Sequence, residues 1–325
     1  MALSAAFWNY DRTQPILDAR AAVQDLELAC TVLRPEEAFA RAFTDAPYDV
    51  SELSYSNTIT AVSKGEFPYW LIPVFPSRAF RHSAIFIRTD RGIRAPADLA
   101  GRTIGLQEYD MTAAVVARGM LRDEYGCDTA SIRWRAGDKE RTKPLAFPVP
   151  RQPPGLDLEI LPPGRSLEER LLAGELDALI SLRAPAAFTA GDSRIARLFA
   201  DPAAEERAYF RRTGIFPVMH VVGVRKLLVE RDPALPGKLH ELFSIAKQIA
   251  VAELEIIQAP KVTLPWVNDE LHRTREVMGE DYWPYGLGTN RKTLETQLRW
   301  SREDGLQARP VSLEELFAPQ VLTGR

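Results

Sequence analysis

Short apolar runs alternate along the chain with segments whose apolar residues recur at helical spacing. The runs predict strands at residues 3–8, 49–53, 70–75, 84–88 and 103–106. Segments 35–43 and 112–125 instead have the spacing of amphipathic helices, the second with Asp110 or Thr112 as its N-cap. Strands that alternate with helices are typical of α/β proteins with mostly parallel sheets. The pattern therefore predicts an α/β fold.

The same alternation returns in the second half of the chain. Strands are predicted at 156–161, 177–182 and 218–224, and Ser166 with Glu169 forms a capping box that starts a helix at 166–173. Residues 137–154 are rich in proline and charge, which predicts a surface loop or flap. The remaining pattern is helical, with helices expected at 235–250, 269–278, 291–303 and 312–317.

The length of 325 residues predicts two domains, because single hydrophobic cores rarely grow to this size. A new set of strands and helices begins near residue 90. We expect residues 1–88 with 222–325 to form lobe 1 and residues 89–221 to form lobe 2, with a ligand cleft between them. Strands 84–88 and 220–224 are the candidate crossovers, and a two-strand hinge would let the lobes close on a ligand.

Composition narrows the classes of partner. The net charge is −3, with 46% hydrophobic and 26% charged residues and no long basic run, which argues against nucleic acid or an anionic membrane. The N-terminus lacks a secretory pattern, and no apolar run approaches the roughly 20 residues that span a bilayer. Cys30 and Cys127 lack metal-type spacing, so we expect two small buried residues in a reducing cytoplasm.

Candidate chemistry lies in polar loops that follow predicted strands, because ligands of open α/β sheets bind beyond the carboxyl ends of strands. These loops supply the candidate substrate-binding residues Arg12, Ser54, Ser56, Ser77, Arg78, Arg81, Met111, Thr112 and Arg183. Motifs for dinucleotides, phosphates, a nucleophilic serine or a metal are absent from the sequence, so no cofactor is required by it.

The basic side chains of these loops allow two interpretations. Arg78 and Arg81 form either a solvated basic turn or an anion clamp for a dicarboxylate, and the sequence favours neither. Arg183 leaves a buried strand, which favours a ligand contact. Asp11 and Arg12 form a local ion pair or border an aromatic ligand.

Two of the four histidines adjoin the predicted crossover strands. His82 and His220 are either structural residues or proton-transfer groups, since histidine titrates near neutral pH. His240 and His272 lie in amphipathic helices. The aromatic segment 281–286, with Trp283 and Tyr285, is a packed turn or a wall for the ligand.

Several segments together resemble the 4,5-dihydroxyphthalate decarboxylase family over nearly the whole chain. They are Phe75–Ser83 (FPSRAFRHS), Glu108–Ala113 (EYDMTA), Thr213–His220 (TGIFPVMH), Tyr282–Leu287 (YWPYGL), Asn290–Glu295 (NRKTLE) and Glu315–Pro319 (ELFAP). The resemblance implies a two-lobed type 2 periplasmic-binding-protein-like fold with a double-crossover hinge and a helical C-terminal tail. The main departure from the family is the proline-rich segment 137–154.

The resemblance also implies a carboxy-lyase of phthalate degradation that converts 4,5-dihydroxyphthalate to 3,4-dihydroxybenzoate and CO2. His82 or His220 would donate the proton, with Asp11 as a weaker alternative and Tyr109 assisting at a ring hydroxyl. A transport receptor or a sensor of the same fold is the rival function. The sequence leaves open the exact aromatic substrate, a role for a divalent metal and self-association.

Overall fold

The computed structural model describes residues 2–65, 67–137 and 155–322. Within these residues the chain divides into two compact units. Unit 1 comprises Met1–Arg78, Val218–Glu295 and Val311–Arg325, and unit 2 comprises Ala79–Pro217 and Thr296–Pro310. The chain passes from unit 1 to unit 2 after Arg78 and returns before Val218. The boundaries expected from the sequence were 88/89 and 221/222. The predicted loop at 137–154 lies outside the described residues, apart from Gly137.

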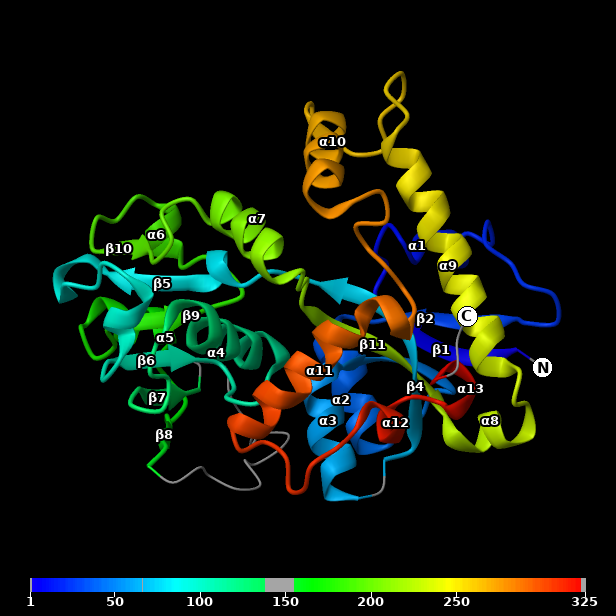
Figure 1. Ribbon diagram of the computed structural model, residues 1–325, viewed down its shortest axis with the longest axis horizontal. Coiled ribbons are helices and arrows are strands. Elements are labelled where there is room, and N and C mark those ends of the chain that lie inside the picture. Colours follow the sequence, from blue (N-terminus) through cyan, green and yellow to red (C-terminus); the bar gives the residue numbers. More distant parts are fainter. Residues whose placement is uncertain (1, 66, 138–154, 323–325) are drawn as a thin grey trace. The chain divides into compact units, whose positions relative to one another are not determined.

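Unit 1 is built on a mixed sheet with strand order β2-β1-β3-β11-β4. Its strands are β1 (Leu3–Phe7), β2 (Leu28–Val32), β3 (Val50–Ser54), β4 (Tyr69–Arg78) and β11 (Val218–Arg225). Strand β1 runs parallel to β2 and β3, whereas β11 is antiparallel to β3 and β4. Helices of the unit are α1 (Gln14–Leu17), α2 (Pro35–Thr44), α3 (Tyr55–Lys64), α8 (Lys226–Arg231), α9 (Leu235–Leu254), α10 (Val267–Met278), α12 (Leu313–Leu316) and α13 (Pro319–Leu322). Figure 1 shows α2 and α3 on one face of this sheet and α9 on the other.

Local sequence explains these elements. Helix α2 starts with Pro35 and carries Glu36 and Glu37 in its first turn, where proline fits and negative charge offsets the helix dipole. Strand β4 contains prolines and lies at the sheet edge, where a missing N–H is tolerated. Gly223 on β11 has no room for a side chain, because an added Cβ would meet Leu53 at 2.4 Å.

Unit 2 contains a second sheet, with strand order β10-β5-β9-β6-β7-β8. These strands are β5 (Ile85–Arg88), β6 (Thr103–Leu106), β7 (Arg133–Ala136), β8 (Asp157–Ile160), β9 (Ala178–Ile180) and β10 (Ile195–Arg197). Its helices are α4 (Thr112–Tyr125), α5 (Leu167–Leu172), α6 (Ala186–Thr189) and α7 (Pro202–Thr213), with short 3-10 turns at His82–Ala84, Thr89–Arg91 and Pro96–Leu99. Leu167 and Leu171 of α5 pack with Phe86 and Leu179 in the core of this unit.

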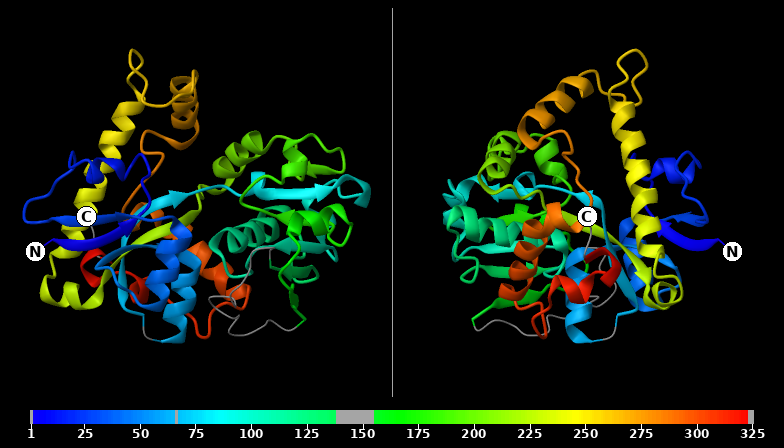
Figure 2. Two further views of the ribbon diagram at one scale, coloured as in Figure 1. Left: turned by 180° about the vertical axis from the view of Figure 1, so that it is seen from behind. Right: turned by 45° about the vertical axis from the view of Figure 1, so that its right-hand side comes forward.

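Helix α11 (Leu287–Glu303) has residues in both units, since its part from Thr296 onward groups with unit 2. Figure 2 shows α11 as one continuous orange helix. The helical tail expected from the sequence is confirmed, and so is the capping box of Ser166 and Glu169. The N-cap prediction for α4 is wrong. Met111 is the N-cap, and α4 begins without a capping hydrogen bond from the side chain of this residue.

Two further properties concern the whole chain. Among the described residues, no helix combines the length and apolar character that crossing a bilayer requires. Cys30 is partly buried and Cys127 is buried, and both are free thiols. Burial raises the pKa of each thiol to about 11, so both remain protonated at neutral pH.

Candidate functional site

Three neighbouring strands of unit 1 bring an acid, a phenol and an imidazole together. Glu52 on β3 is fully buried, and its Oε1 lies 2.6 Å from Nδ1 of His220 on β11. Tyr10, just beyond β1, donates its hydroxyl to the same oxygen at 2.7 Å, and the Trp8 N–H donates to Oε2 at 2.9 Å. Although burial alone would raise the pKa of Glu52, the contacts with His220, Trp8 and Tyr10 hold it below the usual value. Glu52 is therefore a buried carboxylate.

Only one ring nitrogen of His220 contacts Glu52. Nδ1 faces Glu52, while Nε2 has no hydrogen-bond partner among the described residues, and 18% of the side chain is exposed. Its ring packs against that of Phe39 of α2 in a T-shaped arrangement, with 4.8 Å between the ring centroids. In the sheet register His220 stands opposite Ser54 on β3 and Ser77 on β4. An oriented imidazole beside a carboxylate can transfer a proton through Nε2.

Arg12 lies flat between two aromatic rings of the same unit. Its guanidinium carbon is 4.2 Å from the ring centre of Tyr10 and 4.3 Å from that of Trp283. Nε donates to the carbonyl of Pro76 at 2.6 Å and Nη1 to Asp11 at 2.8 Å, which confirms the predicted local ion pair. Nη2 has no partner in the described parts of the chain. A guanidinium fixed in this way can present one edge to an anion.

Arg78 holds the aromatic turn in place. It donates to the carbonyl of Pro284 at 3.0 Å and to the side chain of Asn290, and burial lowers its pKa to about 9. Trp283 donates its indole N–H to the Phe75 carbonyl at 2.9 Å. The hydroxyl of Tyr285 is buried and has no hydrogen-bond partner among the described residues. Segment 281–286 is thus a packed turn that also supplies one face of the Arg12 sandwich.

The serine candidates of unit 1 occupy the end of β3 and the start of α3. Ser54 is the N-cap of α3, is buried, and donates its hydroxyl to Asn57 at 2.5 Å. Ser56 is buried in the first turn of α3, and Ser77 is partly buried on β4. Of the three, Ser54 and Ser77 adjoin His220 in the register.

His82 belongs to unit 2 and has a different environment. It is completely buried, and its Nε2 lies 2.8 Å from the Tyr125 hydroxyl, which donates to Glu205 at 2.6 Å. Because that phenol has only one hydrogen, Nε2 of His82 must be the donor to its oxygen. Rings of Phe199 and Tyr209 pack against the imidazole, and burial lowers the pKa of His82 to about 4. His82 is therefore neutral at pH 7.

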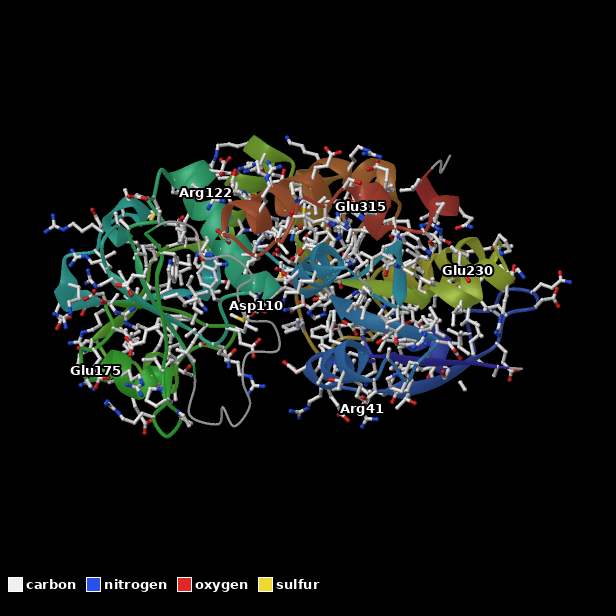
Figure 3. All side chains as sticks on the ribbon, turned by 90° about the horizontal axis from the view of Figure 1, so that it is seen from below. Arg41, Asp110, Arg122, Glu175, Glu230 and Glu315 are labelled. Carbon is white, nitrogen blue, oxygen red and sulfur yellow. The ribbon has the colours of Figure 1, made fainter. Side chains whose placement is uncertain are left out.

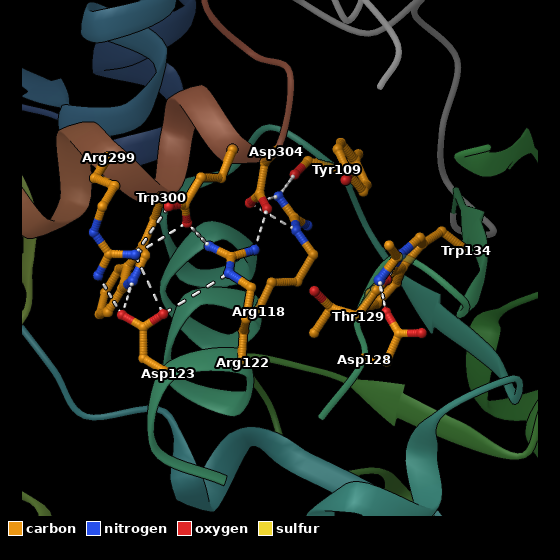
Figure 4. Close-up of polar contacts among 12 residues, drawn as sticks. Tyr109, Arg118, Arg122, Asp123, Asp128, Thr129, Trp134, Arg299, Trp300 and Asp304 are labelled. Atoms are coloured by element: carbon orange, nitrogen blue, oxygen red, sulfur yellow. Dashed lines mark hydrogen bonds and ion pairs between the residues drawn. The ribbon is translucent and has the colours of Figure 1, made fainter. Parts of the chain in front are cut away.

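Tyr109 is enclosed by a network of charged residues in unit 2 (Figure 4). Arg118 of α4 stacks on its ring at 3.7 Å and pairs with Asp304 at 2.8 Å. Asp304 is also 3.3 Å from Arg122, and Arg118 donates to the Tyr109 carbonyl at 2.7 Å. Burial raises the pKa of Tyr109 to about 12. These contacts attach segment 296–310 to α4.

The remaining candidates of unit 2 are Arg81, Arg183, Met111 and Thr112. Arg81 is partly buried near Glu206, and burial lowers its pKa to about 10. Arg183 is exposed after β9. Met111 and Thr112 lie at the start of α4, with Thr112 buried.

Sequence reasoning missed two residues of the unit 1 set, Glu52 and Tyr10. An acid inside the strand Val50–Ser54 is a signal that could have identified Glu52, because isolated charges are rarely buried without a partner. No comparable signal distinguishes Tyr10. Among the described residues, no group of three or more His, Cys, Asp or Glu side chains is arranged to hold a metal ion.

Comparisons with known proteins give close relatives in sequence. No protein-family model matches the chain. The chain is 40% identical over 323 residues to a 4,5-dihydroxyphthalate decarboxylase of Comamonas testosteroni, which covers 98% of this chain and 97% of that protein. It is also 40% identical over 209 residues to a protein of the same name from Pseudomonas putida, with 64% of this chain and 81% of that one covered.

Solved structures share the fold at low sequence identity. A periplasmic sulfonate-binding protein from Methylobacillus flagellatus aligns with a TM-score of 0.57 and 11% identity, covering 99% of this chain and 92% of that one. The periplasmic aliphatic sulphonate-binding protein of Escherichia coli aligns with a TM-score of 0.52 and 12% sequence identity, with 98% of each chain covered. A DszB variant in complex with biphenyl-2-sulfinic acid aligns with a TM-score of 0.50 and 16% sequence identity, covering 99% of this chain and 97% of that one. The two-lobed periplasmic-binding-protein-like α/β fold expected from the sequence is confirmed.

Proposed function

The chain belongs to the 4,5-dihydroxyphthalate decarboxylase family, and we propose that it converts 4,5-dihydroxyphthalate to 3,4-dihydroxybenzoate and CO2. The observation that carries this proposal is the 40% identity to the Comamonas testosteroni enzyme over 98% of the chain. The protein is accordingly a carboxy-lyase, and its substrate is an aromatic carboxylate. Its fold also accommodates an aromatic sulfinate in the DszB variant, which shows that such a framework can hold an aromatic anion.

The substrate itself supplies the electrons for the reaction. Each carboxylate is para to a ring hydroxyl, so a phenolate makes the carbon that bears the carboxylate basic. A proton added to that carbon gives a ring with one tetrahedral carbon. The bond to CO2 then breaks, its electron pair returns to the ring, and aromaticity and the phenolate are restored. No electron-sink cofactor is needed for this sequence of steps.

His220 is the proton donor in our proposal. Glu52 stabilises the protonated imidazole through Nδ1, which leaves Nε2–H to protonate the ring carbon. His82 is less suited to this step, since an imidazole with a pKa of about 4 carries no transferable extra proton at pH 7. A well-placed acid of this kind contributes about 10²–10⁴-fold to the rate.

Arg12 is the residue that we propose for the carboxylate that stays on the ring. Its stacking on Tyr10 places it beside the Glu52–His220 pair, since the Tyr10 hydroxyl is 3.3 Å from Nδ1 of His220. Trp283 would provide an aromatic surface next to the substrate ring. Arg78 supports this arrangement by ordering the turn. The anion contacts that the sequence predicts for Arg81 and Arg183 of unit 2 stay predictions.

One incubation tests the proposed function against a binding-only function. Purified, metal-stripped protein is mixed with 4,5-dihydroxyphthalate, and both CO2 and 3,4-dihydroxybenzoate are followed. Stoichiometric formation of both products is expected without added metal. Tight binding with the phthalate recovered unchanged would instead assign a receptor or sensor. Turnover that appears only after a divalent metal is restored would overturn the cofactor-free reaction.

A cytoplasmic location is also proposed, on the basis of the two free thiols. Cys30 and Cys127 are unpaired, as expected where thiols are kept reduced. Fractionation of cells that produce the chain should recover it with cytoplasmic markers, and recovery with periplasmic markers would contradict this location.

A further inference from the structure

The buried acid of the unit 1 set makes two contacts besides the one with His220 that the proposed reaction uses. Glu52 receives three hydrogen bonds from two segments: the N–H of Trp8 and the hydroxyl of Tyr10 from the loop after β1, and Nδ1 of His220 from β11. Strands β1 and β11 both adjoin β3, which carries Glu52, in the sheet order β1-β3-β11. A side chain that is fully buried with this many donors is fixed in position.

Hydrogen positions in this set follow from donor and acceptor chemistry. A backbone N–H can only donate, so Oε2 accepts from Trp8. Tyr10 lies 2.7 Å from Oε1 and 3.3 Å from Nδ1, so its one hydrogen points to the carboxylate. At 2.6 Å from the same oxygen, Nδ1 of His220 must carry a hydrogen, because two facing lone pairs would repel.

We infer that Glu52 is the positioning residue that fixes the tautomer of His220, with hydrogen on Nδ1 and with Nε2 as the nitrogen that acts on the substrate. This inference rests on the proposed function for its catalytic part. Phe39 completes the positioning, since its ring packs against the imidazole in a T-shaped arrangement with 4.8 Å between centroids and opposes rotation of the imidazole. The charged and titratable groups around the imidazole are Glu52 from β3 and Tyr10 from the loop after β1, with Arg12 stacked on Tyr10.

The tautomer decides whether the imidazole can both receive and deliver a proton at the substrate. With hydrogen fixed on Nδ1, neutral His220 presents a lone pair at Nε2, and the protonated ring presents Nε2–H at the same point. If hydrogen moved to Nε2 in the neutral ring, Nδ1 would turn its lone pair toward Glu52. Protonation at the working nitrogen would then no longer be coupled to a carboxylate.

Glu52→Gln tests this directly, because the amide keeps the shape of the acid and can donate to Nδ1. The protein has four histidines, so ¹⁵N NMR of labelled full-length chain can resolve them, and His220→Gln identifies the His220 signals. We expect the Nδ1–H tautomer in the unaltered protein and the Nε2–H tautomer in Glu52→Gln. The kcat should fall by about 10²-fold or more, with a KM change below about threefold and a shifted alkaline limb of the pH profile, where the protonated donor is lost.

Tyr10→Phe provides a second variant in case Glu52→Gln unfolds, because it removes one donor from Glu52 and leaves the acid in place. It should retain the Nδ1–H tautomer and lower kcat by about tenfold at most. Glu37→Gln, on the exposed side of α2, is the control, and its His220 tautomer and kcat should match those of the unaltered protein. An Nε2–H tautomer in the unaltered protein, or an unchanged kcat in Glu52→Gln, would overturn the inference.

Failure of the proposed function gives a different result. If the unaltered protein shows the Nδ1–H tautomer but releases no CO2, the decarboxylase proposal is refuted while the positioning of His220 by Glu52 is supported. The NMR measurement is independent of turnover, so the two outcomes are distinguishable.

Discussion

The pair of Arg118 and Asp304 allows a quantitative prediction about how unit 2 is held together. Both side chains are nearly inaccessible, with 1% and 3% exposed, and Arg118 is closed in by the ring of Tyr109. Burial alone would lower the pKa of Arg118, but Asp304 and Tyr109 outweigh it and raise the value. The Arg118 guanidinium therefore stays charged, and its charge is buried without a partner when Asp304 is replaced.

Asp304→Asn should lower the free energy of unfolding by about 3–5 kcal/mol, the usual result of leaving one charge of a buried pair unpaired. Replacing both partners, as in Arg118→Met with Asp304→Leu, should recover most of this loss, because no buried charge remains. Segment 296–310 should also become more accessible to protease in the single variant, since Asp304 attaches that segment to α4.

Denaturant unfolding followed by circular dichroism and tryptophan fluorescence measures both variants. The control is Glu175→Gln, which alters an ion pair with Arg165 near the surface of the same unit, where water screens the charges (Figure 3). The loss in free energy of unfolding in Glu175→Gln should be several times smaller than that in Asp304→Asn. A loss below about 1 kcal/mol in Asp304→Asn, or a double variant as unstable as the single one, would refute the reasoning.

Three other predictions follow from buried groups and from the anion site. The folded state keeps His82 neutral down to about pH 4, whereas an unfolded histidine titrates near 6.5. The contribution of His82 to the free energy of unfolding is therefore fully present above pH 6.5. Denaturant titrations should show that this free energy falls by about 3 kcal/mol as the pH drops to 4. His82→Gln should remove that slope, and an unchanged slope would contradict it. Gly119→Ala should destabilise the protein by about 1–3 kcal/mol, since a Cβ would lie 2.1 Å from the buried ring of Trp300. The matched Gly237→Ala, with open space around it, should be neutral or slightly stabilising in the same melts. Arg12→Lys should raise the KM for 4,5-dihydroxyphthalate about tenfold with a smaller change in kcat, because lysine cannot stack between the two rings; an unchanged KM would remove Arg12 from the anion site.

Elements with strong local periodicity could be predicted from the sequence. The long apolar face of α9, the buried strand β4 and the capping box at Ser166 all have signals within a few residues. Strand β2 and helix α7 were missed, because β2 is mostly exposed and α7 is largely polar, so neither has a clear apolar face. Segment 296–310 groups with unit 2 through long-range ion pairs, and local patterns carry no information on such pairs.

The candidate site shows the same division. His220 and Arg12 were found because they lie in polar segments next to strands. The partner of His220 was not found, since Glu52 is 168 residues away in the chain and only the sheet register brings them together. The burial of His82 and its low pKa depend on Tyr125, Phe199 and Tyr209, which come from two other parts of unit 2.

Single-turnover release of CO2 by His220→Gln, beside His82→Gln, is the most direct test of the account. Excess protein is mixed with 4,5-dihydroxyphthalate at pH 7, and binding is measured separately. We expect His220→Gln to bind the phthalate but to release CO2 at least 10²-fold more slowly, while the rate of His82→Gln stays within a few-fold of that of the unaltered protein. Full activity in His220→Gln with loss of activity in a folded His82→Gln would contradict it.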